Sequence, residues 1–213
     1  LFLNERYTDY VKKNTIRYIV GIDEVGRGPI AGPVAVGACC VPADFDFSFC
    51  NGIRDSKKLT AKKREEWEQK IIAAKKAGRL AYAVSFVSRK IIDTRGLSYA
   101  IQKALATSLQ KVSRYPKNSQ VLLDGGLKAP PDFIHQKTII KGDEKEPVIS
   151  LASIVAKVAR DRHMVKLSKR YPHYNFHIHK GYGTKVHYQK IHQHGLSKEH
   201  RRSFLKGLKY VEK

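Results

Sequence analysis

The stretch Tyr18-Ile-Val-Gly-Ile-Asp-Glu24 decides the fold of this 213-residue chain. Its residues are apolar until the two acids at its end, which predicts a buried strand that finishes on Asp23 and Glu24. A short loop, Gly26-Arg27-Gly28-Pro29, comes next, and residues 34–41 form a second apolar run. We therefore expect two strands, with a glycine-rich loop directly after a pair of carboxylates.

Working outward from this stretch, strand patterns alternate with helix patterns. Further strands are predicted at 80–87, 120–124 and 138–140, and helices at 60–77, 97–112, 147–170, 184–194 and 203–211. Thr60 is expected to cap the first of these helices. Strands followed by helices predict an α/β fold with a mixed central sheet flanked by helices. The last third of the chain is expected to be mainly helical.

The charge balance predicts an anionic partner. There are 41 Lys and Arg against 19 Asp and Glu, a net charge of +22. Such an excess favours nucleic acid as the partner, and the alternative is a merely solvated basic surface. With 42% hydrophobic and 28% charged residues, the composition is that of a globular protein, which excludes a wholly disordered chain.

Membrane and secretion signals are missing from the sequence. The longest apolar runs fall far short of the ~20 residues of a membrane span, and no signal peptide is visible. Three cysteines, Cys39, Cys40 and Cys50, lack a C-x-x-C spacing, which is typical of a reduced protein. We therefore expect a cytoplasmic protein without a membrane partner. We also expect a monomer. Adjacent on a strand, Cys39 and Cys40 should point to opposite faces.

Two more acids sit at comparable places along the chain. Asp124 closes a predicted strand, and Asp143 follows the next one in Lys-Gly-Asp. Strand ends are where α/β sheets build their sites. Together with Asp23 and Glu24 these acids would repel one another unless divalent cations compensate, and carboxylate oxygens suit Mg²⁺ or Mn²⁺ rather than zinc. Two such ions ~4 Å apart can activate a water at a phosphodiester. The alternative is a set of isolated loop acids and helix caps.

Two loops are candidates for binding a nucleotide. Gly26-Arg27-Gly28 would let the backbone approach a nucleotide closely, although a plain turn has the same sequence. Asp55-Ser56-Lys57-Lys58 offers a hydroxyl and two cations, which suits a phosphate clamp or a solvated surface.

Other polar residues are interpreted as structural. His173, His177 and His179 lack the spacing of a zinc finger and are expected at the surface or facing phosphates. Asp161 is expected to pair with a neighbouring cation, and Trp67 to pack in or near the core.

Taken in order, these motifs resemble bacterial ribonuclease HII from about Tyr18 to Phe204. The blocks that carry the resemblance are residues 21–29, 55–59, 123–125, 141–143, 152–161, 179–185 and 200–204. The resemblance implies an RNase H-like fold with a helical C-terminal extension. We expect a catalytic domain at 1–170 and a basic extension, packed on it, at 171–213. A departure lies at Gly125-Gly126, where a more polar second residue is expected.

The resemblance also implies roles for single residues. Asp23, Glu24, Asp124 and Asp143 match the family's metal-binding catalytic acids, with Mg²⁺ or Mn²⁺ as cofactor. The loop that senses the ribonucleotide 2′-OH corresponds to Gly26, Arg27 and Gly28, and the tyrosine beside the scissile junction to Tyr182. Residues that resemble phosphate contacts are Ser56, Lys57, Lys58, Lys180 and Lys185.

The implied activity is metal-dependent hydrolysis of the RNA strand of RNA–DNA hybrids, and nicking 5′ of single ribonucleotides in duplex DNA to leave 3′-OH and 5′-phosphate ends. Water is the expected nucleophile. Ribonuclease HIII, which shares the fold and the acids, is one alternative; it normally carries an N-terminal domain for which we expect no room here. The other is a non-enzymatic nucleic-acid-binding protein, which would gain nothing from acids at strand ends.

Overall fold

A mixed five-stranded sheet forms the centre of the computed structural model, which describes residues 16–53 and 59–208. The strands are β1 (Tyr18–Val25), β2 (Val34–Pro42), β3 (Ala81–Val87), β4 (Ser119–Asp124) and β5 (Gln136–Ile139). Their order is β3-β2-β1-β4-β5, antiparallel from β3 to β1 and parallel from β1 to β5. The predicted mixed sheet is confirmed.

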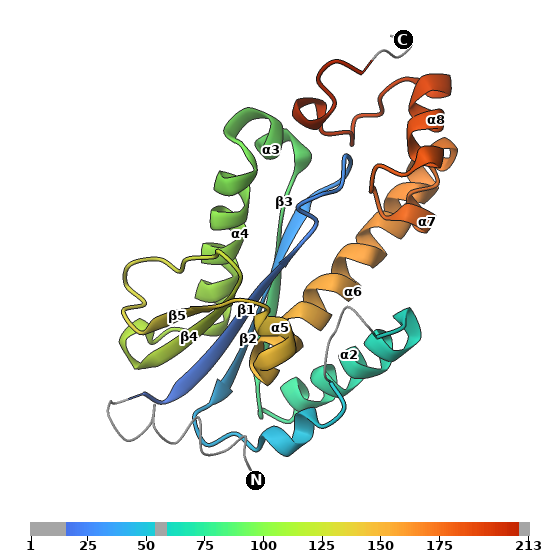
Figure 1. Cartoon of the computed structure of the whole chain (residues 1–213). Coiled ribbons are helices and arrows are strands. Elements are labelled where there is room, and N and C mark those ends of the chain that lie inside the picture. Colours follow the sequence, from blue (N-terminus) through green and yellow to red (C-terminus); the bar gives the residue numbers. More distant parts are fainter. Residues whose placement is uncertain (1–15, 54–58, 209–213) are drawn as a thin grey trace.

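Helices cover both faces of this sheet (Figure 1). The described residues form the helices α2 (Ala61–Lys76), α3 (Arg89–Arg95), α4 (Leu97–Val112), α5 (Gly142–Lys145), α6 (Pro147–Arg170), α7 (Phe176–His179) and α8 (Lys185–His194), of which α2 and α6 pack on one face of the sheet and α4 on the other. Short 3-10 helices lie at Phe47–Cys50, Pro116–Asn118, Pro172–Tyr174 and Arg202–Phe204. As predicted, Thr60 caps α2, its hydroxyl accepting from the Lys63 N–H at 3.2 Å. No helix in the described part of the chain has the length and apolarity needed to cross a membrane.

One predicted helix is wrong in its described part. The pattern at 203–211 forms only the 3-10 helix Arg202–Phe204 and turns up to residue 208, and the rest lies outside the described residues. The backbone N–H groups of Arg202 and Ser203 donate to Asp93, so a tertiary contact fixes this segment. Gly207, with a φ of 83°, then turns the chain out of a helical path.

The two faces of the sheet have separate cores. Ile19 and Cys39 pack with α2 and α6 on one face, while Val20 and Cys40 pack with α4 on the other. The two cysteines point to opposite faces, as predicted. In β1, a Cβ on Gly21 would lie 2.2 Å from the Val148 carbonyl oxygen, so glycine is what allows α6 to approach the strand this closely.

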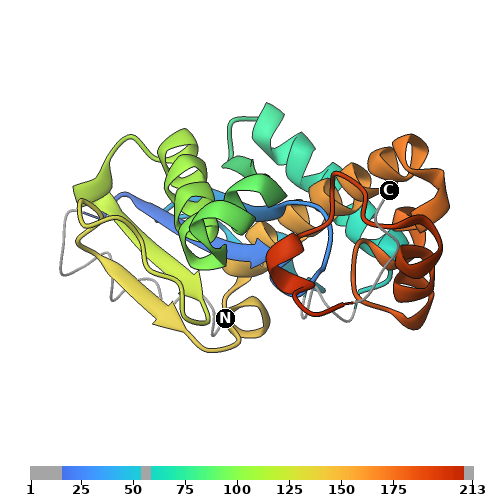
Figure 2. The same ribbon diagram turned by 90° about the horizontal axis from the view of Figure 1, so that it is seen from above.

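A third apolar cluster joins the C-terminal region to the connection between β1 and β2. Ile30 and Ala31 of that connection pack with Met164 and with residues after α6, among them Phe176 and Ile191. Seen from above, the orange and red C-terminal elements gather at one side of the molecule, away from β5 (Figure 2). The C-terminal region thus lies beside the end of β1, where the candidate acids are. The predicted boundary after residue 170 stays a prediction.

Candidate active site

Sheet topology brings the predicted acids to one edge. β1 and β4 are parallel neighbours with Ile22 opposite Leu123, so Asp23, near the end of β1, and Asp124, the last residue of β4, lie at the same side. Asp143 lies on α5, shortly after β5, and its side chain is fully buried. Charges on Glu24, Asp124 and Asp143 all act on Asp23. The four carboxylates therefore form one electrostatic group.

Burial makes Asp23 and Glu24 hard to ionise. Asp23 is 4% exposed, and its burial raises its pKa to about 8; a hydrogen bond with Ser153 opposes the rise, and the three neighbouring acids add to it. Burial also raises the pKa of Glu24, against the hydrogen bond and positive charge of Arg27. A carboxylate cluster of this kind calls for a positive charge to stabilise its ionised form.

The donor chemistry fits a hard divalent cation, since all four side chains offer carboxylate oxygens. In this structure the oxygens face protein groups: Glu24 Oε1 lies 2.9 Å from Arg27 Nη1, and Asp124 Oδ1 accepts from the Gly142 N–H at 2.6 Å. The buried Glu24 Oε2 has no hydrogen-bond partner among the described residues. Within residues 16–53 and 59–208, no three His, Cys, Asp or Glu side chains are arranged to hold an ion. Glu24 and Asp124 each keep a second carboxylate oxygen beside the one that contacts these partners.

A cleft of about 450 Å³ opens beside the acids. Its walls are formed by Asp23, Glu24, Val25, Gly26, Arg27, Gly28, Arg64, Asp124, Ser153, Lys157 and Tyr182. A Cβ on Gly28 would lie 3.7 Å from the Tyr182 ring, so the Gly-Arg-Gly loop and the tyrosine face each other. Segments far apart in the sequence thus meet next to the carboxylates.

The predicted phosphate contacts are more scattered. Lys180 lines an adjoining groove, where its ammonium donates to the His177 carbonyl. Lys185 is exposed at the start of α8 and is absent from the walls of both the cleft and that groove. Ser56, Lys57 and Lys58 lie outside the described residues.

Three polar cleft residues were given no role from the sequence, namely Arg64, Ser153 and Lys157, although the last two lie in the block 152–161 that carries the resemblance. Ser153 and Lys157 are four residues apart on α6 and so share a helix face, which is a signal that helical spacing could have given. Lys157 also lies 2.7 Å from Asp161, which confirms the predicted pairing of that acid.

The histidine prediction is wrong at one position. His173 and His177 are exposed, but His179 is 8% exposed and stacks on His187 with ring centroids 4.2 Å apart. Phe176 packs edge-on against both rings, so the neutral imidazoles serve as flat core side chains. Trp67 is buried, as predicted.

Comparison with known proteins decides the family. Residues 20–207 match the family model described as Ribonuclease HII. The chain belongs to the ribonuclease HII family. It is 44% identical over 199 residues to ribonuclease HII of Bacillus cereus (strain Q1), covering 93% of this chain and 73% of that protein. The resemblance drawn from the motifs is therefore confirmed, and the family is HII rather than the HIII alternative.

Solved structures support the same fold. Ribonuclease H2 from Pyrococcus horikoshii OT3 superposes with a TM-score of 0.69 at 26% identity, covering 87% of this chain and 93% of that one. Bst-RNase HIII in complex with Mn²⁺ reaches a TM-score of 0.63 at 17% identity, covering 85% and 64%, which shows the fold alone. As a ribonuclease HII family member, the protein is an endoribonuclease that acts on RNA–DNA hybrids.

Proposed function

We propose that this ribonuclease HII is metal-dependent and that it also nicks duplex DNA on the 5′ side of a single embedded ribonucleotide, leaving 3′-OH and 5′-phosphate ends. One observation carries the proposal. The carboxylates of Asp23, Glu24 and Asp124 share a cleft with the bare backbone at Gly28 and with Tyr182. Hydrolytic groups and groups suited to reading a sugar are thus side by side.

The metal site of the proposal consists of Asp23, Glu24, Asp124 and Asp143. A bound Mg²⁺ or Mn²⁺, or a pair of them, would activate the attacking water and stabilise the leaving oxygen. Support comes from the all-oxygen donor set and from the raised pKa of Asp23, since buried acids at one edge need a cation to stay ionised together. Water is the nucleophile, and no covalent enzyme intermediate forms. The Mn²⁺ complex of the structurally similar Bst-RNase HIII is in keeping with this.

Discrimination of RNA from DNA is assigned to the loop and the tyrosine. Only a ribonucleotide carries a 2′-OH, and the hydroxyl can be read by backbone donors and acceptors. Gly28 is exposed and has no side chain to block its peptide groups, while the ring of Tyr182, 42% exposed, offers a flat face for the adjoining sugar.

Phosphate binding is assigned to a basic groove that continues from the cleft. This basic groove, about 650 Å³, is lined by Ala61, Arg64, Glu65, Lys157, Val158, Asp161, Arg162, Val165, Lys166, Lys169, Ile178 and Lys180. Arg64 and Lys157 belong to both hollows. Lys166 and Lys169 are exposed on α6 and would attract the backbone of the flanking duplex without reading its sequence. Contacts from Ser56, Lys57, Lys58 and Lys185, a monomeric state and a cytoplasmic location stay predictions.

A nicking assay tests the proposal. A DNA duplex with one ribonucleotide, labelled on that strand, is incubated with the protein and with Mg²⁺, Mn²⁺ or EDTA. We expect a single cut 5′ of the ribonucleotide with either metal and none with EDTA. Cutting that persists in EDTA, or intact single-ribonucleotide duplex alongside a cleaved RNA–DNA hybrid, would refute it.

A further inference from the structure

Two arginines are fully buried beneath the Gly-Arg-Gly loop. Arg160 and Arg201 are both 0% exposed, and their guanidinium groups donate hydrogen bonds to backbone carbonyls. The Arg201 guanidinium donates to the carbonyls of Gly26 at 2.7 Å, Arg27 at 3.0 Å and Gly32 at 2.9 Å. One planar side chain therefore fixes three peptide groups of the connection between β1 and β2.

These hydrogen bonds also set where the loop's N–H groups point. In a trans peptide the carbonyl and the following N–H point in opposite directions. Holding the carbonyls of Gly26 and Arg27 toward Arg201 turns the N–H groups of Arg27 and Gly28 away from it. Those three loop residues line the cleft, whereas Arg201 lies behind them. The buried guanidinium thus directs backbone donors to the side where a 2′-OH would bind.

His200, the residue before Arg201, is connected to Tyr182 through hydrogen bonds that pass by way of His187. His200 Nδ1 accepts from the Ser197 N–H at 2.8 Å, so its neutral ring carries the proton on Nε2. That Nε2–H donates to His187 Nε2 at 3.0 Å, which leaves the His187 proton on Nδ1, donating to the Tyr182 carbonyl at 2.8 Å. His187 and His200 are 0% and 1% exposed. The tautomers are therefore determined along the whole chain of bonds, which ends on Tyr182.

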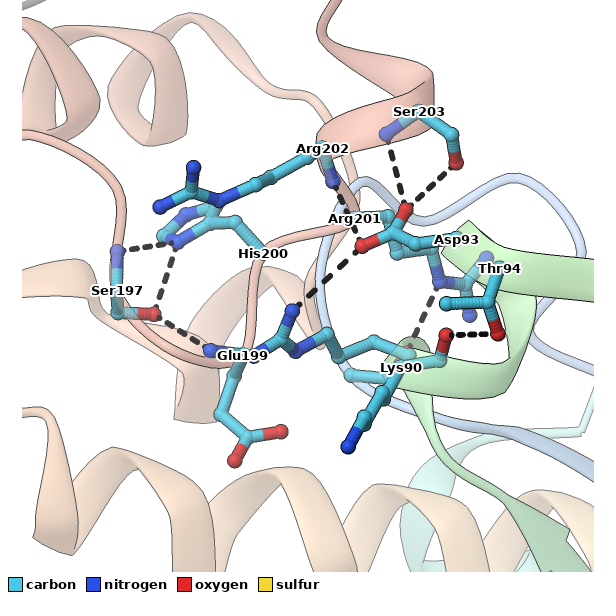
Figure 3. A network of polar contacts seen from close by, with 11 residues as sticks. Lys90, Asp93, Thr94, Ser197, Glu199, His200, Arg201, Arg202 and Ser203 are labelled. Atoms are coloured by element: carbon cyan, nitrogen blue, oxygen red, sulfur yellow. Dashed lines mark hydrogen bonds and ion pairs between the residues drawn. The ribbon is translucent and has the colours of Figure 1, made fainter.

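The segment that carries His200 and Arg201 is itself anchored. Asp93 of α3 accepts from the N–H of Arg202 at 3.1 Å, the N–H of Ser203 at 2.9 Å and the Ser203 hydroxyl at 2.6 Å (Figure 3). The Arg201 N–H donates to the Ile30 carbonyl at 2.8 Å. A short segment from the C-terminal region is thus tied to a helix on one side and to the β1–β2 connection on the other.

We propose that His200 and Arg201 are positioning residues that hold the two halves of the ribonucleotide-recognition site, the Gly-Arg-Gly loop and Tyr182, in fixed relation to each other. Neither side chain touches the cleft; both act through the backbone they bind. Arginine is required because its fork meets three carbonyls at once, whereas a lysine ammonium is a compact point charge. The inference rests on the proposed function, since it assigns those two elements to recognition.

Arg201→Lys tests the proposal, with Arg202→Lys as its matched control, because Arg202 is exposed and contacts Asp93 through its backbone. The readouts are kcat and KM on a single-ribonucleotide duplex, and Kd for an all-DNA duplex of the same sequence. For Arg201→Lys we expect kcat to fall roughly a hundredfold, as small misplacements do, with Kd for plain DNA within twofold of wild type. Arg202→Lys should match wild type. Unchanged kcat, or equal losses in kcat and in plain-DNA binding, would overturn the proposal.

A second pair of variants decides the matter if Arg201→Lys does not fold. His200→Gln keeps a donor near the Nε2 position, and His200→Leu removes it. We expect the glutamine variant to retain most single-ribonucleotide cleavage and the leucine variant to lose it, at similar melting temperatures. Equal activities would contradict a positioning role. The wild-type protein in the same assay tests the proposed function separately, because its failure to nick would appear before any variant is compared.

Discussion

Gly28 and Tyr182 face each other across the cleft, and a Cβ added to the glycine would meet the tyrosine ring at an ordinary van der Waals distance of 3.7 Å. Gly28→Ala should therefore fold normally but place a methyl group where the 2′-OH approaches. We expect a tenfold or greater loss of kcat/KM on a single-ribonucleotide duplex. Gly126→Ala is the control, because that exposed glycine near Asp124 has no atom within 4 Å of an added Cβ. Equal kcat/KM for the two variants would argue against recognition at Gly28.

Tyr182 should matter most for cleavage of a duplex with a single ribonucleotide, because that substrate offers only one RNA–DNA junction. Tyr182→Ala removes the flat face and should misplace the scissile phosphate, at a cost of roughly a hundredfold in rate. Tyr182→Phe keeps the ring and should be milder. The measurement is the initial cleavage rate of each variant on a single-ribonucleotide duplex and on a longer RNA–DNA hybrid. For Tyr182→Ala, the rate on the single-ribonucleotide duplex should fall more than the rate on the hybrid. Equal losses of rate on both substrates would mean that Tyr182 only packs against its neighbours and does not recognise the junction.

The buried histidines predict a loss of stability in mild acid. Burial lowers the pKa of His187 to about 4 and of His200 to about 3, and the positive charge of Arg89 also disfavours the protonated form of His200. Their unfolded pKa is about 6.5, so between pH 6.5 and these values only the unfolded chain takes up the protons. The free energy of unfolding should then fall as pH falls, by about 1.4 kcal/mol per pH unit for each such histidine.

Urea unfolding from pH 7.5 to 4.5 without divalent ions checks this slope. Asp23 acts in the opposite direction, because its raised pKa makes the folded state take up a proton first. The comparison of wild type with His200→Gln therefore isolates the histidine, and the variant should show the shallower acid decline. His173→Gln, at an exposed position, should decline like wild type. Parallel curves for all three proteins would mean that His200 is not buried and neutral.

Charge in the basic groove should set affinity and its salt dependence. Lys169→Glu, in the groove, should weaken binding to a hybrid and to an all-DNA duplex about equally, and flatten the dependence of Kd on salt. Lys103→Glu is the control, being exposed on α4 at the other face of the sheet. Binding titrations at several salt concentrations measure both the Kd and its dependence on salt. A wild-type Kd that does not change with salt would exclude phosphate gripping altogether.

Local patterns predicted most of the sheet and the place of the acids. A strand that ends in Asp23 and Glu24 is visible in an apolar run, and the parallel pairing of β1 with β4 carries Asp124 to the same edge. The buried polar residues that support the site could not be predicted from local sequence patterns. A buried Arg201 or His179 looks like surface in a basic sequence, because its partners are carbonyls and rings supplied by tertiary contacts. The helix predicted at 203–211 failed for the same reason, since Asp93 binds its start.

The central claim is that the acids at the strand ends make the cut in a metal-dependent way, and Asp124→Asn tests it most directly. Asparagine keeps an oxygen that can accept from the Gly142 N–H, and it removes a negative charge that raises the pKa of Asp23. The variant should fold at least as stably as wild type. Its single-turnover rate of nicking with Mg²⁺, compared with wild type and with the exposed-site control Asp132→Asn, is the measurement. We predict a loss of several orders of magnitude in Asp124→Asn alone; a rate near that of wild type would contradict the account.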